Sequence, residues 1–225
     1  MKKYKYFLLH CFIFVIGCTA QKQFIENDEL CEFDQTILKN EKTFFLKDLT
    51  QSEINTLNKY KQVEIVNSKD YSIKLFRFSN QDSLITKMVL NKKTNIIKSL
   101  FYNVNDGKLS IVDFTYNYGD LPIGTAKFYN KSGEVIKTEN DNDYYNYPIC
   151  FKEAIDIVEN KLKGKDSIVA INREKKVIKE KDTLYYWDVF VREISENKED
   201  KPWIYRINAS NGKLIDKLKV ITVHR

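Results

Sequence analysis

Short apolar runs separated by polar turns dominate the chain between residues 63 and 139. Each run is rich in β-branched and aromatic residues, which favour strands over helices. The seven runs are VEIV (63–66), YSIKLFRF (71–78), LITKMVL (84–90), IIKSLFYNV (96–104), KLSIVDFTY (108–116), GTAKFYN (124–130) and EVIKTE (134–139). Because the connections are short, the runs predict an antiparallel meander.

A repeated turn supports this prediction. The segments 102–107, 128–133 and 207–212 each begin with a large apolar residue and end, five positions later, with Gly preceded by Asp, Ser or Asn. A looser fourth copy puts Asn95 in the position of the Gly. Gly and Asn adopt positive φ at low cost, as tight hairpins require. We therefore expect repeated hairpins.

The last third of the chain repeats the strand pattern after a single helix. Strand candidates are SIVAI (167–171), KKVI (175–178), LYYWDVFV (184–191), WIYRIN (203–208) and KLIDKLKVITV (213–223). In the third of these, Tyr185, Trp187, Val189 and Val191 alternate and predict one apolar face. An antiparallel sheet backed by the helix would bury the apolar face of each.

Two helices are predicted. A capping box, Thr50 to Glu53, precedes apolar residues at helical spacing and predicts a helix of about three turns. The second helix is amphipathic, with apolar residues at Phe151, Ala154, Ile155, Val158 and Leu162. Cys150 stands at its cap position with Glu153 three residues later, and Gly164 follows as a stop.

Between 29 and 46 the pattern is ambiguous: Phe33, Ile37 and Leu38 fit a short helix, and TFFL (43–46) fits a strand.

The expected fold is therefore α+β, an antiparallel β meander followed by a single helix packed on an antiparallel sheet. Residues 139–148, ENDNDYYNYP, carry no apolar alternation and mark a boundary. The predicted organisation is a signal peptide at 1–17, a tether at 18–27, short helices and a meander at 28–140, and an α+β domain at 149–225.

The N-terminal segment is a targeting signal by composition. Three lysines precede an apolar stretch from Phe7 to Ile16, about half the ~20 residues that a membrane-spanning helix needs. The ending Val-Ile-Gly-Cys18 resembles the lipobox of bacterial lipoproteins, although Ile16 departs from the usual Ala or Ser. The resemblance implies lipidation of Cys18 and a location in the bacterial cell envelope, anchored at the outer membrane on its periplasmic or surface side. The alternative is cleavage after Ala20, which yields a secreted or soluble periplasmic protein.

The net charge indicates which classes of partner are expected. The formal charge is +6, and without the three lysines of the signal the balance is 34 basic against 31 acidic residues, which is no nucleic-acid footprint. The Lys-rich run 173–182 is interrupted by acids and is interpreted as a solvated face.

Only two cysteines, Cys31 and Cys150, follow the signal and Cys18. An exported compartment permits them to pair, and two separately buried thiols are the alternative.

Two family resemblances follow from these motifs. The C-terminal third resembles the PepSY domain in the residues Glu153, Ala154, Ile155, Tyr186, Trp187, Val189, Tyr205, Ile207, Asn208, Gly212 and Leu214. It departs in Asn208, where Asp is usual, and in Cys150, where Ser or Thr commonly caps. This resemblance implies a non-catalytic module that binds or restrains peptidases. The segment 116–139 resembles MORN-type repeats of bacterial envelope proteins in Gly119, Gly124, Phe128, Tyr129 and Gly133.

Few residues of the sequence are candidates for catalysis or metal binding. The two histidines are His10, in the signal, and His224, next to the last residue, which argues against His-based catalysis and zinc sites. Asp141-x-Asp143 starts like a calcium loop, but its later positions do not fit. Asp113 and Asp188 lie inside strand patterns, where burial could raise the pKa of either acid. The alternatives are a position on the solvent face or a pair with a cation such as Arg192. We expect no catalytic residue, no metal and no cofactor.

Aromatic residues are the remaining candidates for a protein-binding surface. Tyr144, Tyr145 and Tyr147 crowd the boundary loop, and Trp203 and Tyr205 lie on the closing strand, although core packing explains them equally well. The expectation is a non-catalytic, lipid-anchored envelope protein that binds a protein partner, with restraint of a peptidase or toxin as its specific form. The alternative is a structural envelope protein whose MORN-like hairpins act in assembly.

Overall fold

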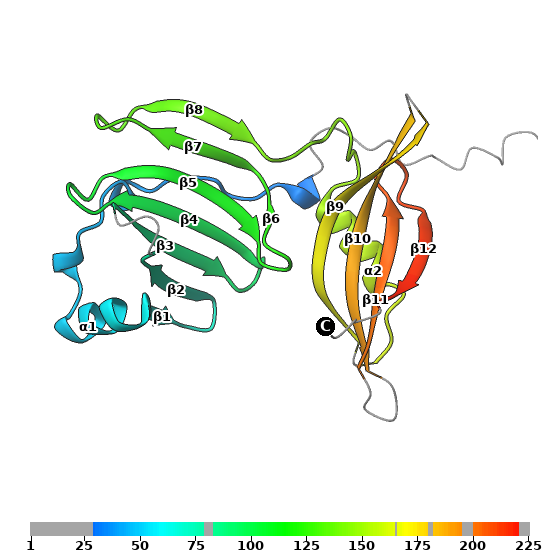
Figure 1. Cartoon of the computed structure of the whole chain (residues 1–225), viewed down its shortest axis with the longest axis horizontal. Helices are drawn as coiled ribbons and strands as arrows, with labels where there is room; N and C mark the ends of the chain where they lie inside the picture. Colours follow the sequence, from blue (N-terminus) through cyan, green and yellow to red (C-terminus); the bar gives the residue numbers. More distant parts are fainter. Residues whose placement is uncertain (1–28, 79–82, 165, 180–181, 195–199, 221–225) are drawn as a thin grey trace, which may run out of the picture.

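The computed structural model describes residues 29–78, 83–164, 166–179, 182–194 and 200–220 (Figure 1). The predicted signal peptide, the lipidation residue Cys18 and the tether up to residue 27 lie outside the described residues, and so do His10 and His224. Within the described ranges, no helix has the length and apolar composition needed to cross a membrane.

The chain is an α+β protein whose strands all pair antiparallel. Its helical elements are the 3-10 turns η1 (Glu29–Cys31), η2 (Lys39–Glu41) and η3 (Leu46–Asp48) and the α-helices α1 (Gln51–Tyr60) and α2 (Phe151–Glu159). The strands are β1 (Gln62–Asn67), β2 (Tyr71–Phe76), β3 (Leu84–Asn91), β4 (Ile96–Asn103), β5 (Leu109–Tyr116), β6 (Leu121–Pro122), β7 (Thr125–Tyr129), β8 (Val135–Asn140), β9 (Ser167–Lys179), β10 (Asp182–Ile194), β11 (Asp200–Asn208) and β12 (Leu214–Lys219).

The predicted meander is confirmed as an eight-stranded sheet in the order β1-β2-β3-β4-β5-β7-β8, with the short β6 paired to β5 (Figure 1). The repeated turns take the expected conformation: φ is +68° at Gly107, +86° at Gly133, +68° at Gly212 and +54° at Asn95. Sequence reasoning missed β6, because a two-residue strand containing Pro122 carries no alternation.

One face of the large sheet, the inner face, carries buried side chains such as Leu100, Val112 and Phe114. An arm, residues 29–49, covers this face; Phe33 packs edge-on to Phe114 with ring centroids 5.3 Å apart. A partly buried ion pair also holds the arm, because Lys98 Nζ lies 2.7 Å from a carboxylate oxygen of Glu41. The arm therefore closes the core of the meander.

The two predictions for the arm were wrong. Residues 32–38 form no helix, and TFFL forms no strand beyond an isolated bridge between Thr43 and Lys108. The arm instead bonds to groups of the sheet: the Glu41 carbonyl accepts from the Tyr102 hydroxyl at 2.8 Å, and Gln35 Oε1 accepts from the Thr125 amide at 2.9 Å. These tertiary bonds take the place of local hydrogen bonds.

Helix α1 follows the predicted capping box, because Thr50 Oγ1 accepts from the Glu53 amide at 3.3 Å while the Glu53 carboxylate accepts from the Thr50 amide at 2.7 Å. Helix α2 begins after Cys150 as predicted but ends at Glu159, short of Leu162. The chain there tightens into i to i+3 bonds, from Lys161 to Val158 and from Leu162 to Glu159, and Leu162 still packs on the core.

The C-terminal sheet, called the small sheet from here on, has four strands in the order β12-β11-β10-β9, and α2 packs against β9 and β10 (Figure 1). The separate candidates SIVAI and KKVI are one continuous strand, β9. Buried side chains of both sheets join in a single hydrophobic cluster, with Tyr116 of β5 and Phe151 of α2 at a ring-centroid distance of 4.8 Å. The Ile171 amide also donates to the Tyr118 carbonyl at 3.3 Å, which links the turn after β5 to β9.

Candidate binding site at the junction of the two sheets

A disulfide joins Cys31 of η1 to Cys150, the residue before α2, with a Cα–Cα distance of 6.3 Å. Of the two alternatives that the sequence left open, the structure has the bonded one. Both half-cystines are buried, each with 5% of its surface exposed. The bond ties the start of the arm to the helix of the small sheet across a sequence separation of 119 residues.

The loop between β8 and α2, residues 141–149, crosses this junction and is held at several points. Its first amide, on Asp141, donates to the Gly124 carbonyl at 2.8 Å. Farther along, the Tyr147 hydroxyl donates to the Glu174 carbonyl of β9 at 2.8 Å. Asn146 Nδ2 donates to the Asp143 carboxylate at 2.8 Å, within the loop. The loop is therefore fixed to both sheets.

Trp187 of β10 is the centre of the packing under this loop. It is 1% exposed, and its indole Nε1 donates to the Ile149 carbonyl at 2.8 Å. The ring of Tyr147 lies 5.0 Å from the Trp187 ring and 5.6 Å from that of Tyr185, measured between centroids. Burial raises the pKa of the Tyr147 hydroxyl to about 12, so this side chain remains a neutral hydrogen-bond donor.

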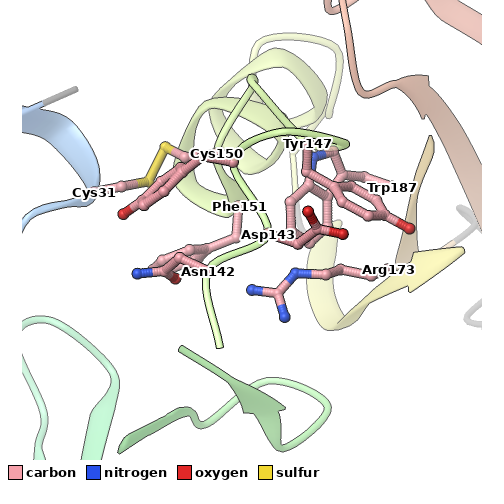
Figure 2. A pocket seen from close by; sticks show the side chains of 9 residues that line it. Cys31, Asn142, Asp143, Tyr147, Cys150, Phe151, Arg173 and Trp187 are labelled. Atoms are coloured by element: carbon pink, nitrogen blue, oxygen red, sulfur yellow. A yellow bond between two sulfur atoms is a disulfide. The ribbon is translucent and has the colours of Figure 1, made fainter. Parts of the chain in front are cut away.

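A small cavity lies among these groups (Figure 2). Its volume is about 10 Å³, on the scale of one water molecule. The lining residues are Cys31, Asn142, Asp143, Tyr144, Tyr147, Cys150, Phe151, Arg173 and Trp187. The cavity thus brings together the disulfide, the start of α2, the boundary loop and two strands of the small sheet.

Arg173 of β9 supplies the positive charge at this junction. Its guanidinium carbon lies 5.4 Å from the centroid of the Trp187 ring, and Figure 2 shows the side chain reaching from the strand under Asp143. Its Nε is buried and has no hydrogen-bond partner among the described residues. Burial lowers the pKa of Arg173 and is opposed by Tyr147, Asp141 and Asp143, so the cation sits in an acidic surrounding.

The sequence did not single out Arg173, because it opens the run that was interpreted as a solvated face. Residues 174–178 of that run are indeed exposed. Arg173 pairs with Trp187 across β9 and β10, which turns its side chain towards the junction. Only the strand register, which no local signal specifies, would have identified it.

The five aromatic residues predicted as a surface do not form one patch. Tyr145 is 94% exposed, but Tyr147 and Tyr205 are buried at 7% and 5%. Tyr144 and Trp203 are half-buried. Of these five residues only Tyr145 is fully exposed, and it lies two positions before the buried Tyr147 in the same loop.

Trp203 and Tyr205 belong instead to a network on the small sheet. Lys217 Nζ lies 4.6 Å and 4.8 Å from the centroids of the Trp203 and Tyr205 rings. The Glu193 carboxylate accepts from the Tyr205 hydroxyl at 2.7 Å and from Lys217 Nζ at 2.5 Å. Since the ring of Tyr205 is covered and its hydroxyl is paired, its contacts serve packing of the sheet.

The two candidate acids belong to different sheets. Asp188 forms a two-bond ion pair with Arg206, with both N–O distances at 2.9 Å. The partner is a cation, as one of the alternatives expected, but it is Arg206, where the sequence suggested Arg192. Burial raises the pKa of Asp113 on β5, and a hydrogen bond from Ser99 opposes the shift. Within the described ranges, no group of three or more His, Cys, Asp and Glu side chains is placed to hold a metal ion.

Comparison of the chain with family models, with curated proteins and with solved structures finds no match. The resemblances to PepSY domains and to MORN-type repeats therefore rest on the sequence motifs alone.

Proposed function

We propose that this chain is a lipid-anchored protein of the bacterial cell envelope that binds a protein partner at the junction of its two sheets. The observation that carries the proposal is Tyr145, which is 94% exposed at the middle of a loop fixed to both sheets. Tyrosine on a rigid support is a favourable anchor, because a partner gains contact area while little side-chain or loop entropy is lost.

Arg173 supports the same surface. It lies under the loop that carries Tyr145, and its Nε has no partner within the described part of the chain. Arginine and tyrosine are the residue types enriched at energetic centres of protein interfaces. Because the Nε is buried beneath the fixed loop, one water in the adjacent cavity would complete its bonding.

The disulfide supports the exported location. Disulfides persist in oxidising compartments such as the bacterial periplasm and the cell surface. Together with the lipobox ending at Cys18, the bond favours an envelope protein. The more specific form of the proposal is restraint of a peptidase or toxin, and the PepSY resemblance supports the peptidase.

The test places a photo-crosslinking amino acid at position 145 of the full chain in intact cells. The control position is Tyr60 on α1, which is also exposed, at 60%. We expect one adduct of defined mass from position 145 and none from position 60, and Tyr145→Ala should reduce recovery of that partner about tenfold. Equal adducts from the two positions, or none from position 145, would contradict the proposal.

The anchor has its own test. A Cys18→Ser variant should lose incorporation of labelled fatty acid and move from the membrane to the soluble fraction. A Cys11→Ser variant, changed inside the signal, should keep both properties. Retention of the label by the Cys18 variant would contradict lipidation at this residue.

A second candidate function is a structural role in an assembly, as the MORN resemblance implies. Strand β8 favours it, because all six of its residues are exposed and it forms an edge of the large sheet. Light scattering on the mature chain separates the two candidates: growth in mass with concentration supports assembly, and a constant monomer mass contradicts it.

A further inference from the structure

Strand β8 is an open edge with apolar side chains. It pairs with β7 on one side and forms the end of the eight-stranded sheet on the other (Figure 1). Ile136 is 65% exposed and Val135 is 50% exposed. Exposed apolar edge strands offer unpaired backbone groups to another strand, and proteins usually protect them. This edge therefore suits a further strand.

The outward-facing backbone groups are identified by the β7–β8 ladder. The Asp141 amide bonds to the Gly124 carbonyl at 2.8 Å, and Thr125 is opposite Asn140. Because hydrogen-bonded and non-hydrogen-bonded pairs alternate in an antiparallel ladder, Glu139 and Lys137 point their backbone groups at β7. The amide and carbonyl of Thr138 and of Asn140 thus point away from the sheet.

We propose that the strand completing this edge is β8 of a second copy, antiparallel and centred on Thr138. In that register each Thr138 faces its counterpart, and Lys137 lies opposite Glu139 of the other copy, twice. Opposite charges facing each other across strands stabilise pairing, and this is a non-hydrogen-bonded position, where side chains come closest. Lys137 and Glu139 lie on the same face of β8, where their side chains form an ion pair within one chain. In the dimer, each would face the opposite charge of the other copy.

The neighbouring symmetric registers are unfavourable. Centring the pairing on Lys137 puts two lysines opposite each other, and centring it on Glu139 puts two carboxylates opposite each other, which destabilises a sheet. The bulge between Val135 and Lys137 ends the regular ladder at Ile136, so the contact is short. Charge thus selects one register, and the short ladder makes the dimer weak in solution.

Pairing of β8 with a second copy is a contact that the second candidate function requires, and it is independent of the partner site at Tyr145. The first experiment oxidises Thr138→Cys in the mature chain. The Thr138 positions face each other at about 5.5 Å between Cα atoms, within disulfide range, so a linked dimer should form. Asn140→Cys is the matched control, because two copies of this position would lie roughly 13 Å apart. Equal linking of both variants, or of neither, would overturn the register.

The second experiment measures the dimer by sedimentation velocity. Lys137→Glu and Glu139→Lys should each weaken the dimer about tenfold or more, and the charge swap Lys137→Glu/Glu139→Lys should restore it. These residues are exposed, so urea unfolding should confirm that the fold is intact. A chain that stays monomeric at all concentrations, or a dimer that the single variants do not affect, would overturn the proposal. The photo-crosslinked adduct from position 145 should be unchanged in all these variants. The partner site and the β8 dimer are therefore tested independently of each other.

Discussion

Removing the Cys31–Cys150 disulfide should destabilise the whole chain. The bond closes a loop of 119 residues, for which the chain-entropy relation gives a contribution of about 5 kcal/mol at 25 °C. Both half-cystines are 5% exposed, so Cys→Ala at both positions leaves small apolar groups in their place and adds a modest packing loss. Native disulfides typically contribute about 2–5 kcal/mol, which brackets the expected effect.

Urea unfolding followed by tryptophan fluorescence would measure this effect, because Trp187 lies beside the bond in the same cavity lining. The double-alanine variant should unfold at lower urea, with a steeper dependence of the free energy on urea, since its unfolded chain exposes more surface. Adding a reducing agent to the unchanged chain should reproduce the lower midpoint. A shift below about 1 kcal/mol, with the bond shown to be oxidised in the starting protein, would refute the entropic reasoning.

Two further predictions concern groups of the cores. Trp187→Phe should lower the free energy of unfolding by at least about 1–3 kcal/mol, because the buried Ile149 carbonyl loses its donor. Trp203→Phe should lower it clearly less, because the buried Nε1 of Trp203 has no partner among the described residues. Equal urea midpoints for the two variants would contradict this reasoning. Burial raises the pKa of Asp113 above 3.8, so the folded state is favoured at low pH and loses this contribution as pH rises through the folded pKa. Asp113→Asn should therefore be more stable than the unchanged chain near about pH 7, and the advantage should vanish as pH falls towards the unfolded value; a difference independent of pH would rule out this account.

The strand pattern predicted most of the large sheet because its signals are local. Alternation, β-branched residues and the positive-φ residue at Gly107 or Asn95 act within a single hairpin. The arm could not be predicted in this way, since Gln35 and Glu41 bond to groups about 60 to 90 residues away in sequence, on β4 and β7. Their conformation is decided by the sheet that they cover.

The junction site was only partly predictable for the same reason. The sequence pointed to the tyrosines of the boundary loop and to the two cysteines, because composition marks both. It gave no sign that Arg173 faces Trp187, or that Asp188 pairs with Arg206 rather than Arg192, because both depend on the register between neighbouring strands. Sequence also cannot distinguish an exposed tyrosine from a buried one two residues away.

The covalent loop closed by Cys31 and Cys150 contains every strand of the eight-stranded sheet, β1 to β8. Tension applied between the two ends of the chain would pass through the sulfur–sulfur bond from η1 directly to α2. The meander would carry no load, and only the small sheet and its helix would resist the pull. In the oxidised protein the larger sheet is thus mechanically a side branch, and reduction would place it in series with the rest.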